Sequence, residues 1–162
     1  MLRSRLRSVL LVLLALGLFG CDEATKSVAR ERLAEGSVEI VRGAVELRYV
    51  QNDDIAFSAF RQLGVAHSPA FLAVLALVGI IGAVGLAIAS TRWCARVGLA
   101  LVIGGALGNF ADRVARGYVV DFIHVHGWPV FNVADIAVVV GVGVLLLSRM
   151  RKEKEAPPST VA

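Results

Sequence analysis

The stretch PAFLAVLALVGIIGAVGLAIA, residues Pro69–Ala89, contains no charged side chain. A helix that spans a bilayer needs about 20 predominantly apolar residues, and this stretch meets that requirement alone. The composition agrees, because 57% of the 162 residues are hydrophobic and the mean hydropathy is +0.72. The apolar share is higher than in soluble domains. The sequence therefore indicates a membrane protein.

Three shorter apolar segments accompany this stretch, at Ser8–Cys21, Val97–Ala111 and Ile136–Ser148. Each reaches spanning length only by taking in neighbouring residues, and all three extensions contain carboxylates. Because an ionisable group is costly at membrane depth, such groups are candidates for a functional site. We predict an α-helical membrane protein with a single domain over residues 1–148. Its four transmembrane helices cover about residues 8–28, 69–89, 97–114 and 130–148.

The basic residues predict the orientation of these helices, because cytoplasmic loops carry an excess of lysine and arginine. The three basic groups are Arg3, Arg5 and Arg7, then Arg92 and Arg96, then Arg149, Arg151, Lys152 and Lys154. We therefore predict that both termini are cytoplasmic and that residues 149–162 form a disordered tail there. The acidic helix ends then lie near the outer leaflet. No basic stripe with interleaved aromatic residues indicates a nucleic-acid partner.

One outer segment has the pattern of a strand. In VELRYV, residues Val45–Val50, apolar and charged side chains alternate. We predict a small extracytoplasmic β-sheet within about residues 37–60. Cys21 and Cys94 fall at opposite membrane faces, so we expect no disulfide.

The sequence LFGC, Leu18–Cys21, looks like the cleavage site of a lipoprotein precursor. Such a precursor has one apolar segment followed by a soluble body, whereas three more apolar segments follow here. We therefore expect the first helix to be retained. Asp22 and Lys26 are four residues apart on one face of it, which is the spacing of an ion pair.

Small residues in the second and third helices are expected to permit close helix packing. They are Gly79, Gly82, Gly85, Gly104 and Gly108. Asn109 and Asp112 follow three residues apart on one helix face. Taken alone, Asp112 is best explained as an acid at a helix end that pairs with Arg113.

Two further carboxylates bracket one short outer loop. Asp121 stands between apolar neighbours in VVDFI, where burial would raise its pKa. Asn132 and Asp135 share a helix face and, taken alone, are a cap and a first-turn acid. The short loop should hold Asp121 and Asp135 close enough to share a proton. One could then accept a proton from water while the other donates one to a substrate carbonyl.

The same residues allow other interpretations at this point. His124 and His126 could join Asp121 at a metal, but no His-Glu-x-x-His motif and no zinc-type spacing accompanies them, so we predict none. A small multi-span transporter would use the carboxylates as a proton or cation relay. It should spread acids through the bilayer, whereas Pro69–Ala89 contains none. A protein that binds its ligand at these groups without catalysis is a third alternative.

Five blocks in order resemble the lipoprotein signal peptidases, also called signal peptidase II, from about Leu10 to Leu147. The blocks are Asp22-Glu23-Ala24-Thr25-Lys26, Asn52 with Ala56-Phe57-Ser58, Gly104 to Arg113, Val119 to Ile123, and Phe131 to Asp135. The resemblance implies an aspartic endopeptidase of the bacterial inner membrane that needs no cofactor. Its implied partners are membrane lipids and diacylglyceryl-modified prolipoproteins, which it cuts just before the lipidated cysteine.

The resemblance also implies residue roles. Asp121 and Asp135 would be the catalytic pair, with Asp112 as the other candidate partner of Asp135. The adjacent Arg113 favours a structural role for Asp112. Asn52, Asn109, Arg113 and Asn132 would bind the substrate backbone or orient the pair, and Asp22, Lys26 and Asp112 would support the site.

The chain departs from the family pattern in three places. Glu23 stands where the family usually has glutamine, and Asp53-Asp54-Ile55 replaces a more flexible sequence. The loop between Asp121 and Asp135 is also shorter than expected. The last two departures bear on how the outer sheet and its loop cover a substrate.

Overall fold

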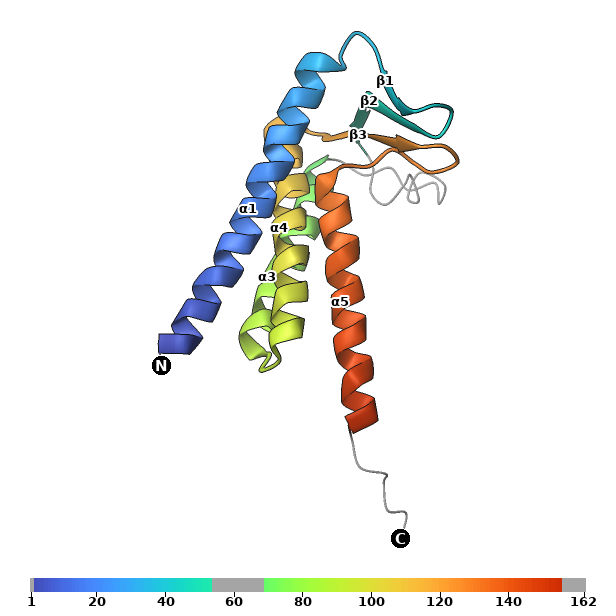
Figure 1. The fold of residues 1–162 in the computed structure, drawn as a ribbon. Helices are drawn as coiled ribbons and strands as arrows, with labels where there is room; N and C mark the ends of the chain where they lie inside the picture. The colour runs from blue at the N-terminus through green and yellow to red at the C-terminus, as the bar shows by residue number, and fades with distance from the viewer. Residues whose placement is uncertain (1, 54–68, 156–162) are drawn as a thin grey trace.

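The computed structural model describes residues 2–53 and 69–155 (Figure 1). Its helices are α1 (Leu2–Arg32), α3 (Pro69–Ala89), α4 (Trp93–Arg116) and α5 (Val133–Glu155), and its strands are β1 (Val38–Val41), β2 (Val45–Asn52) and β3 (Val119–Val125). All four of these helices are long and apolar enough to cross a membrane. The predicted fold class, four spanning helices with a small sheet, is confirmed for this part of the chain.

The helix ends differ from the prediction by several residues, except in α3, whose bounds agree. Helix α1 is longer at both ends, because its arginine-rich start and its polar end continue the same helix. The end of α5 also lies further on, at Glu155, so the prediction of disorder is wrong for residues 149–155. These residues are mostly good helix formers, and no proline precedes Pro157. Residues 156–162, and the block Ala56-Phe57-Ser58, lie outside the described residues.

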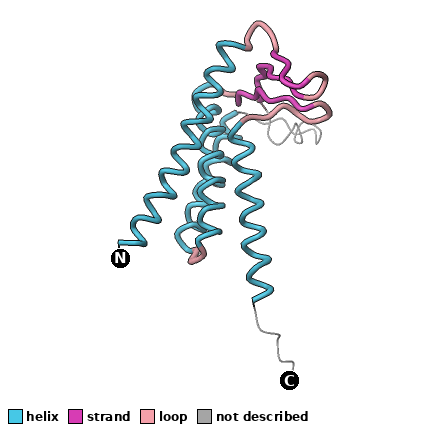
Figure 2. Tube along the Cα trace, viewed as in Figure 1, coloured by secondary structure: helices cyan, strands magenta, loops and turns pink. Residues whose placement is uncertain are grey.

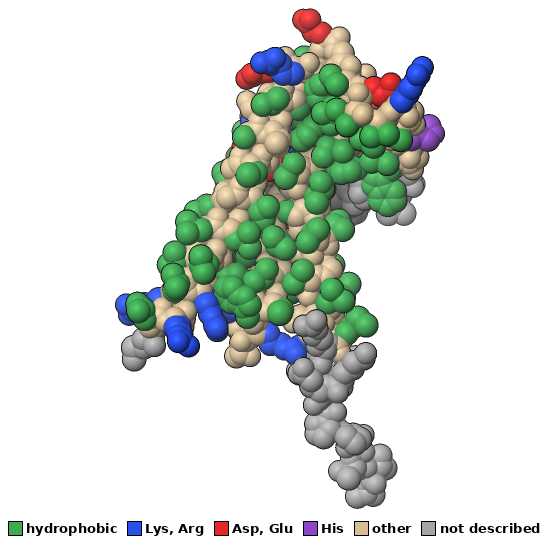
Figure 3. All heavy atoms as spheres, viewed as in Figure 1, with side chains coloured by type: hydrophobic (Ala, Val, Ile, Leu, Met, Phe, Trp, Pro, Cys, Tyr) green, Lys and Arg blue, Asp and Glu red, His purple; other side chains and the backbone are tan. Residues whose placement is uncertain are grey.

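Helix α4 holds the bundle together, because α1, α3 and α5 all pack against it (Figure 1). The outer faces of the helices remain apolar and exposed: Val78 is 60% exposed and Ile81 is 62% exposed. Figure 3 shows hydrophobic side chains over most of one face of the bundle. An apolar exterior of this extent suits a lipid environment.

Glycines set the closeness of α4 to α1 and α5. A Cβ on Gly104 would lie 2.8 Å from the Ala15 carbonyl oxygen, and a Cβ on Gly108 would collide with the Asp22 carboxylate. Gly98 of α4 and Gly141 of α5 face each other in the same way. The expectation for the second helix is wrong, because open space surrounds Gly79, Gly82 and Gly85.

The sheet lies at one end of the bundle, beside the carboxyl end of α1 (Figure 2). Its strands are antiparallel in the order β1-β2-β3. Val120 and Phe122 of β3 form a small core with Ala29 and Leu33, near the end of α1. The predicted β-region did not include β3, whose pairing with β2 joins distant parts of the chain. That pairing sets Val50 opposite Asp121 and Asn52 opposite Val119.

Candidate active site

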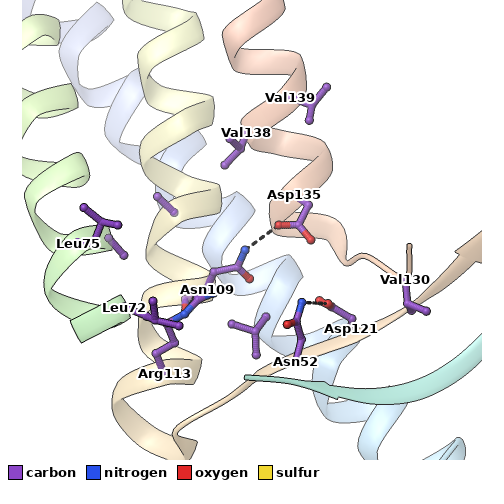
Figure 4. Close-up of a pocket in the computed structure, with 13 residues that line it drawn as sticks. Asn52, Leu72, Leu75, Asn109, Arg113, Asp121, Val130, Asp135, Val138 and Val139 are labelled. Atoms are coloured by element: carbon purple, nitrogen blue, oxygen red, sulfur yellow. Dashed lines mark hydrogen bonds between the residues drawn. The ribbon is translucent and has the colours of Figure 1, made fainter. Parts of the chain in front are cut away.

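A cavity of about 390 Å³ opens at the sheet end of the bundle (Figure 4). Its polar lining consists of Asn52, Asn109, Arg113, Asp121 and Asp135. Its apolar lining consists of Leu72, Leu75, Ala76, Ala106, Val119, Val130, Val138 and Val139. The cavity therefore combines a cluster of charged and amide groups with walls from α3, α4 and α5.

Asp121 reaches this cavity from β3 and is only 2% exposed. Its Oδ2 accepts a hydrogen bond from Asn52 Nδ2 at 2.8 Å, and its Oδ1 accepts one from Asn132 Nδ2 at 2.7 Å. Burial raises the pKa of Asp121 to about 6, and the nearby charge of Asp135 adds to the increase against the opposing effect of the amide bonds. Asp121 can therefore hold a proton near neutral pH, as its apolar sequence context predicted.

Asp135 lies in the first turn of α5 and is half-buried. Its Oδ1 accepts a hydrogen bond from Asn109 Nδ2 at 2.8 Å, and its Oδ2 accepts one from the backbone N–H of Asn132 at 3.2 Å. In return, the Asp135 N–H donates to Asn132 Oδ1 at 3.0 Å. This reciprocal pair caps the start of α5. Helix capping and site formation thus involve the same two residues.

Asn132 joins the two carboxylates. It is fully buried, and it donates from its side chain to Asp121 and from its backbone to Asp135. Its Nδ2 also lies 3.0 Å from Asn109 Oδ1. Figure 4 shows Asp121 and Asp135 at the same cavity, with Asp121 beside Asn52 and Asp135 beside Asn109. The structure therefore brings together the two carboxylates that the sequence pattern paired.

Lys26 supports this arrangement from α1. Its fully buried ammonium lies 2.6 Å from Asp22 Oδ2 and 2.9 Å from Asp112 Oδ2, and it donates to Asn109 Oδ1 at 2.9 Å. These three acceptors match the three N–H donors of an ammonium group. Because Asn109 directs its oxygen towards Lys26, its Nδ2 faces Asp135. The predicted Asp22–Lys26 pair is present, and it connects α1 to the site.

Asp22 and Asp112 also bind the backbone of other elements. Asp22 Oδ1 accepts the Ala134 N–H at 2.9 Å, and Asp112 Oδ2 accepts the Val120 N–H at 3.1 Å. Val120 and Ala134 each directly precede one carboxylate of the cavity. The buried ions therefore position the segments that carry Asp121 and Asp135.

The predicted pairing of Asp112 with Arg113 is wrong. Asp112 pairs with Lys26 and Arg116 instead, because adjacent residues on a helix point about 100° apart, whereas residues four apart share a face. Arg113 lines the cavity, and its Nη1 donates to the backbone oxygen of Asn109 at 3.2 Å. Arg116 also lies 3.5 Å from Glu23. Sequence reasoning missed Arg116, although its spacing from Asp112 was a signal.

His124 and His126 do not line the cavity that holds Asp121 and Asp135. They line a small separate cavity in the sheet, together with Glu39 and Glu46. His124 Nδ1 lies 3.8 Å from Glu46 Oε2. Within residues 2–53 and 69–155, no three His, Cys, Asp or Glu side chains are grouped to hold a metal ion. Cys21 and Cys94 are both free, exposed thiols.

Two carboxylates beside a cavity, one of them with a raised pKa, can share a proton and activate water. Neutral amide donors hold both of them in place. Arg113 adds a positive charge to the lining. The arrangement suits hydrolysis of a peptide bond by general acid–base catalysis.

The family model for signal peptidase (SPase) II matches residues 14–151. A lipoprotein signal peptidase of Halothermothrix orenii is 36% identical over 136 residues, which cover 82% of this chain and 90% of that protein. One of Geobacter sulfurreducens is 33% identical over 148 residues, with 88% and 92% covered. A solved bacterial membrane enzyme superposes with a TM-score of 0.80 at 24% identity, with 94% of each chain covered. A second one has a TM-score of 0.76 at 25% identity, with 86% of this chain and 91% of that chain covered.

Proposed function

The chain belongs to the signal peptidase II family and removes signal peptides from prolipoproteins, and on that premise we propose that Asp121 and Asp135 are its catalytic pair. The observation that supports this proposal most directly is the double role of Asn132, which bonds both carboxylates at one cavity. Asp22, Lys26 and Asp112 then act as positioning residues behind them.

Asp121 is the acid and Asp135 is the base in this proposal. Asp121 is almost fully buried and its pKa is raised to about 6, so it keeps a proton more readily than an exposed aspartate does. Asp135 is half-buried, lines the cavity and accepts hydrogen bonds from Asn109 and from the Asn132 backbone, so a water molecule in the cavity can reach it. The burial of Asp121 therefore suits the acid, and the position of Asp135 at the cavity suits the base.

Hydrolysis proceeds in two stages. Asp135 accepts a proton from a water molecule as the water oxygen attacks the scissile carbonyl carbon, and Asp121 donates its proton to the carbonyl oxygen. The tetrahedral intermediate then loses one hydroxyl proton to Asp121, while Asp135 protonates the leaving nitrogen as the C–N bond breaks. Both carboxyl groups return to their starting states, and no covalent enzyme intermediate forms.

The remaining polar residues divide into two groups. The amides of Asn109 and Asn132 are engaged with Lys26 and the carboxylates, so we assign them to orienting the pair. Arg113 lines the cavity and can meet a substrate carbonyl, and Asn52 lies at the cavity beside Asp121. The apolar walls from α3 and α5 suit the apolar part of a substrate.

The substrate we propose is a prolipoprotein whose cysteine carries diacylglycerol, cut just before that cysteine. The apolar helix faces beside the cavity would let a lipid-anchored substrate approach from the bilayer. We propose the inner membrane as the location, with both termini cytoplasmic and the cavity near the outer leaflet, since the arginine groups lie at the other end of the bundle.

The test is cleavage of a diacylglyceryl-modified precursor, beside its unmodified form, by purified enzyme. Asp121→Asn and Asp135→Asn should each lower the cleavage rate at least about 1,000-fold, because each removes one half of the proton exchange. Glu46→Gln is the matched control, an acid-to-amide change in the same sheet that should leave the rate unchanged. Substantial activity in either site variant would reject the pair, and equal cleavage of both precursors would reject the lipid requirement.

A further inference from the structure

A second cavity, of about 340 Å³, lies in the half of the bundle away from the carboxylates. It runs between α1 and α3, which both pack on α4. The lining residues are Ser8, Leu11, Val12, Ala15 and Leu16 of α1, Val84, Ala87 and Ile88 of α3, and Arg96, Ala100, Ile103 and Leu107 of α4. Each set follows helical spacing, so three apolar stripes form one groove.

The groove has the depth of one leaflet. Its α4 stripe runs from Arg96 to Leu107, which at 1.5 Å per residue is about 16 Å. The hydrocarbon core of a bilayer is about 30 Å thick. The groove also opens sideways, because its rim residues Val12 and Ile88 are 57% and 74% exposed. In a bilayer, acyl chains would reach it directly.

The end of the groove furthest from the carboxylates is positively charged. Arg96 lines it, and its Nε donates to the Ala87 carbonyl at 3.1 Å, which uses one of five N–H donors. The Arg7 guanidinium lies 5.6 Å from the centre of the Trp93 ring. Trp93 is about one helical turn before Arg96 on α4. Neither residues 1–21 nor residues 55–111 contain an acid. Figure 3 shows basic side chains gathered at this end, below the apolar face.

We propose that this groove binds an anionic phospholipid from the leaflet at the arginine end, with an acyl chain along the three stripes and the phosphate at Arg96. The charge selects this occupant over the signal peptide of a substrate. Signal peptides carry a positively charged amino-terminal region, which these arginines would repel. A zwitterionic lipid would fill the same apolar space with a weaker headgroup contact.

The bound lipid would support the first half of α1. That helix touches α4 closely at Ala15–Gly104 and at Asp22–Gly108. The groove occupies the interval between α1 and α3 beside the Ala15–Gly104 contact, and in the described residues these two helices do not touch each other. An acyl chain there would fill the interval and hold α1, whose far end carries Asp22 and Lys26.

The experiment is native mass spectrometry of the full chain, titrated with phosphatidylglycerol or with phosphatidylcholine of the same acyl chains. Phosphatidylglycerol should bind at lower concentration. Arg96→Gln should reduce that preference about fivefold, because one arginine near a membrane surface contributes about that much to binding an anionic lipid. Arg149→Gln is the matched control, since it removes an exposed arginine at the same end, on α5, which does not line the groove.

A second variant tests the apolar part. Val12→Trp should fill the groove from an exposed position and weaken binding of both lipids, while prolipoprotein cleavage shows that the protein remains folded. Glycerol phosphate, which has no acyl chains, should not compete. Equal binding of the two lipids, equal effects of Arg96→Gln and Arg149→Gln, or unchanged binding in Val12→Trp would each overturn the proposal. Displacement of the lipid by a synthetic signal peptide would overturn it as well.

Discussion

Two pairs of carboxylates lie within one end of this bundle, and their partners differ. Asp22 and Asp112 share the ammonium group of Lys26, and Asp112 also pairs with Arg116. Asp121 and Asp135 instead accept hydrogen bonds from asparagine amides and a backbone N–H. In the described ranges, neither forms an ion pair. The first two acids therefore have a counter-charge within ion-pair distance, whereas the second two are held by neutral donors.

This comparison explains why Asp112 and Asp121 suit different tasks despite similar burial. Asp112 is 0% exposed and Asp121 is 2% exposed, so burial alone does not separate them. The difference between the two acids comes from Lys26 and Arg116, which form ion pairs with Asp112. It favours Asp121 over Asp112 as the proposed partner of Asp135.

The largest effect on stability is expected at the shared cation. Lys26→Met leaves Asp22 and Asp112 buried with one cation fewer, which should cost about 3–5 kcal/mol of unfolding free energy. It also removes a donor from Asn109, so cleavage should fall with stability. Thermal unfolding in detergent measures the loss. A variant as stable as the wild type would show that Asp22 and Asp112 do not depend on a cation, and so do not differ from Asp121 and Asp135 in this respect.

The pH dependence of stability should reveal the proton that buried Asp121 holds. Its pKa is higher in the folded state, about 6, than its ordinary 3.8, so the native state binds the proton more tightly. Stability should therefore fall as pH rises from about 4 to about 6, by up to about 3 kcal/mol at 1.36 kcal/mol per pKa unit. Asp121→Asn should remove this loss. Measuring the unfolding free energy of the wild type and of Asp121→Asn at pH 4 and pH 7 tests this, and an equal pH dependence in the two proteins would contradict the prediction.

A smaller effect is expected where α4 meets Asp22. Gly108→Ala places a methyl group against that carboxylate and should cost about 1–3 kcal/mol through overpacking. Gly79→Ala is the control, because open space surrounds Gly79. Thermal unfolding of both variants tests the prediction, which fails if the two substitutions have equal effects.

The smallest effect is expected at the rim of the ion cluster. Arg116 is partly exposed, so Arg116→Gln should cost no more than about 1 kcal/mol while Asp112 keeps its ion pair with Lys26. Cleavage should change little. Arg32→Gln, at the exposed end of α1, is the control. A loss as large as that of Lys26→Met would show that Arg116, and not Lys26, holds Asp112.

Much of the site was predictable because its residues have regular local spacing. Asp22 and Lys26 are four residues apart, and Asn132 and Asp135 are three apart, so a helix or its cap joins each pair whatever surrounds it. The prediction failed for Asp112, where a neighbour in sequence was chosen over a residue one turn away. It also left β3 out of the sheet, because the partner of β3 is β2, more than sixty residues earlier.

The sequence by itself determined that the chain spans a membrane four times and which ends of the helices carry the acids. Those properties follow from the length and polarity of single segments. Only the tertiary structure decided which acids meet a cation and which meet amides. Lys26 and Asn109 are 83 residues apart, and Asn52 and Asp121 are 69 apart. Hydrogen bonds over such separations depend on how α1, α4 and the sheet pack together, and no local pattern specifies that packing.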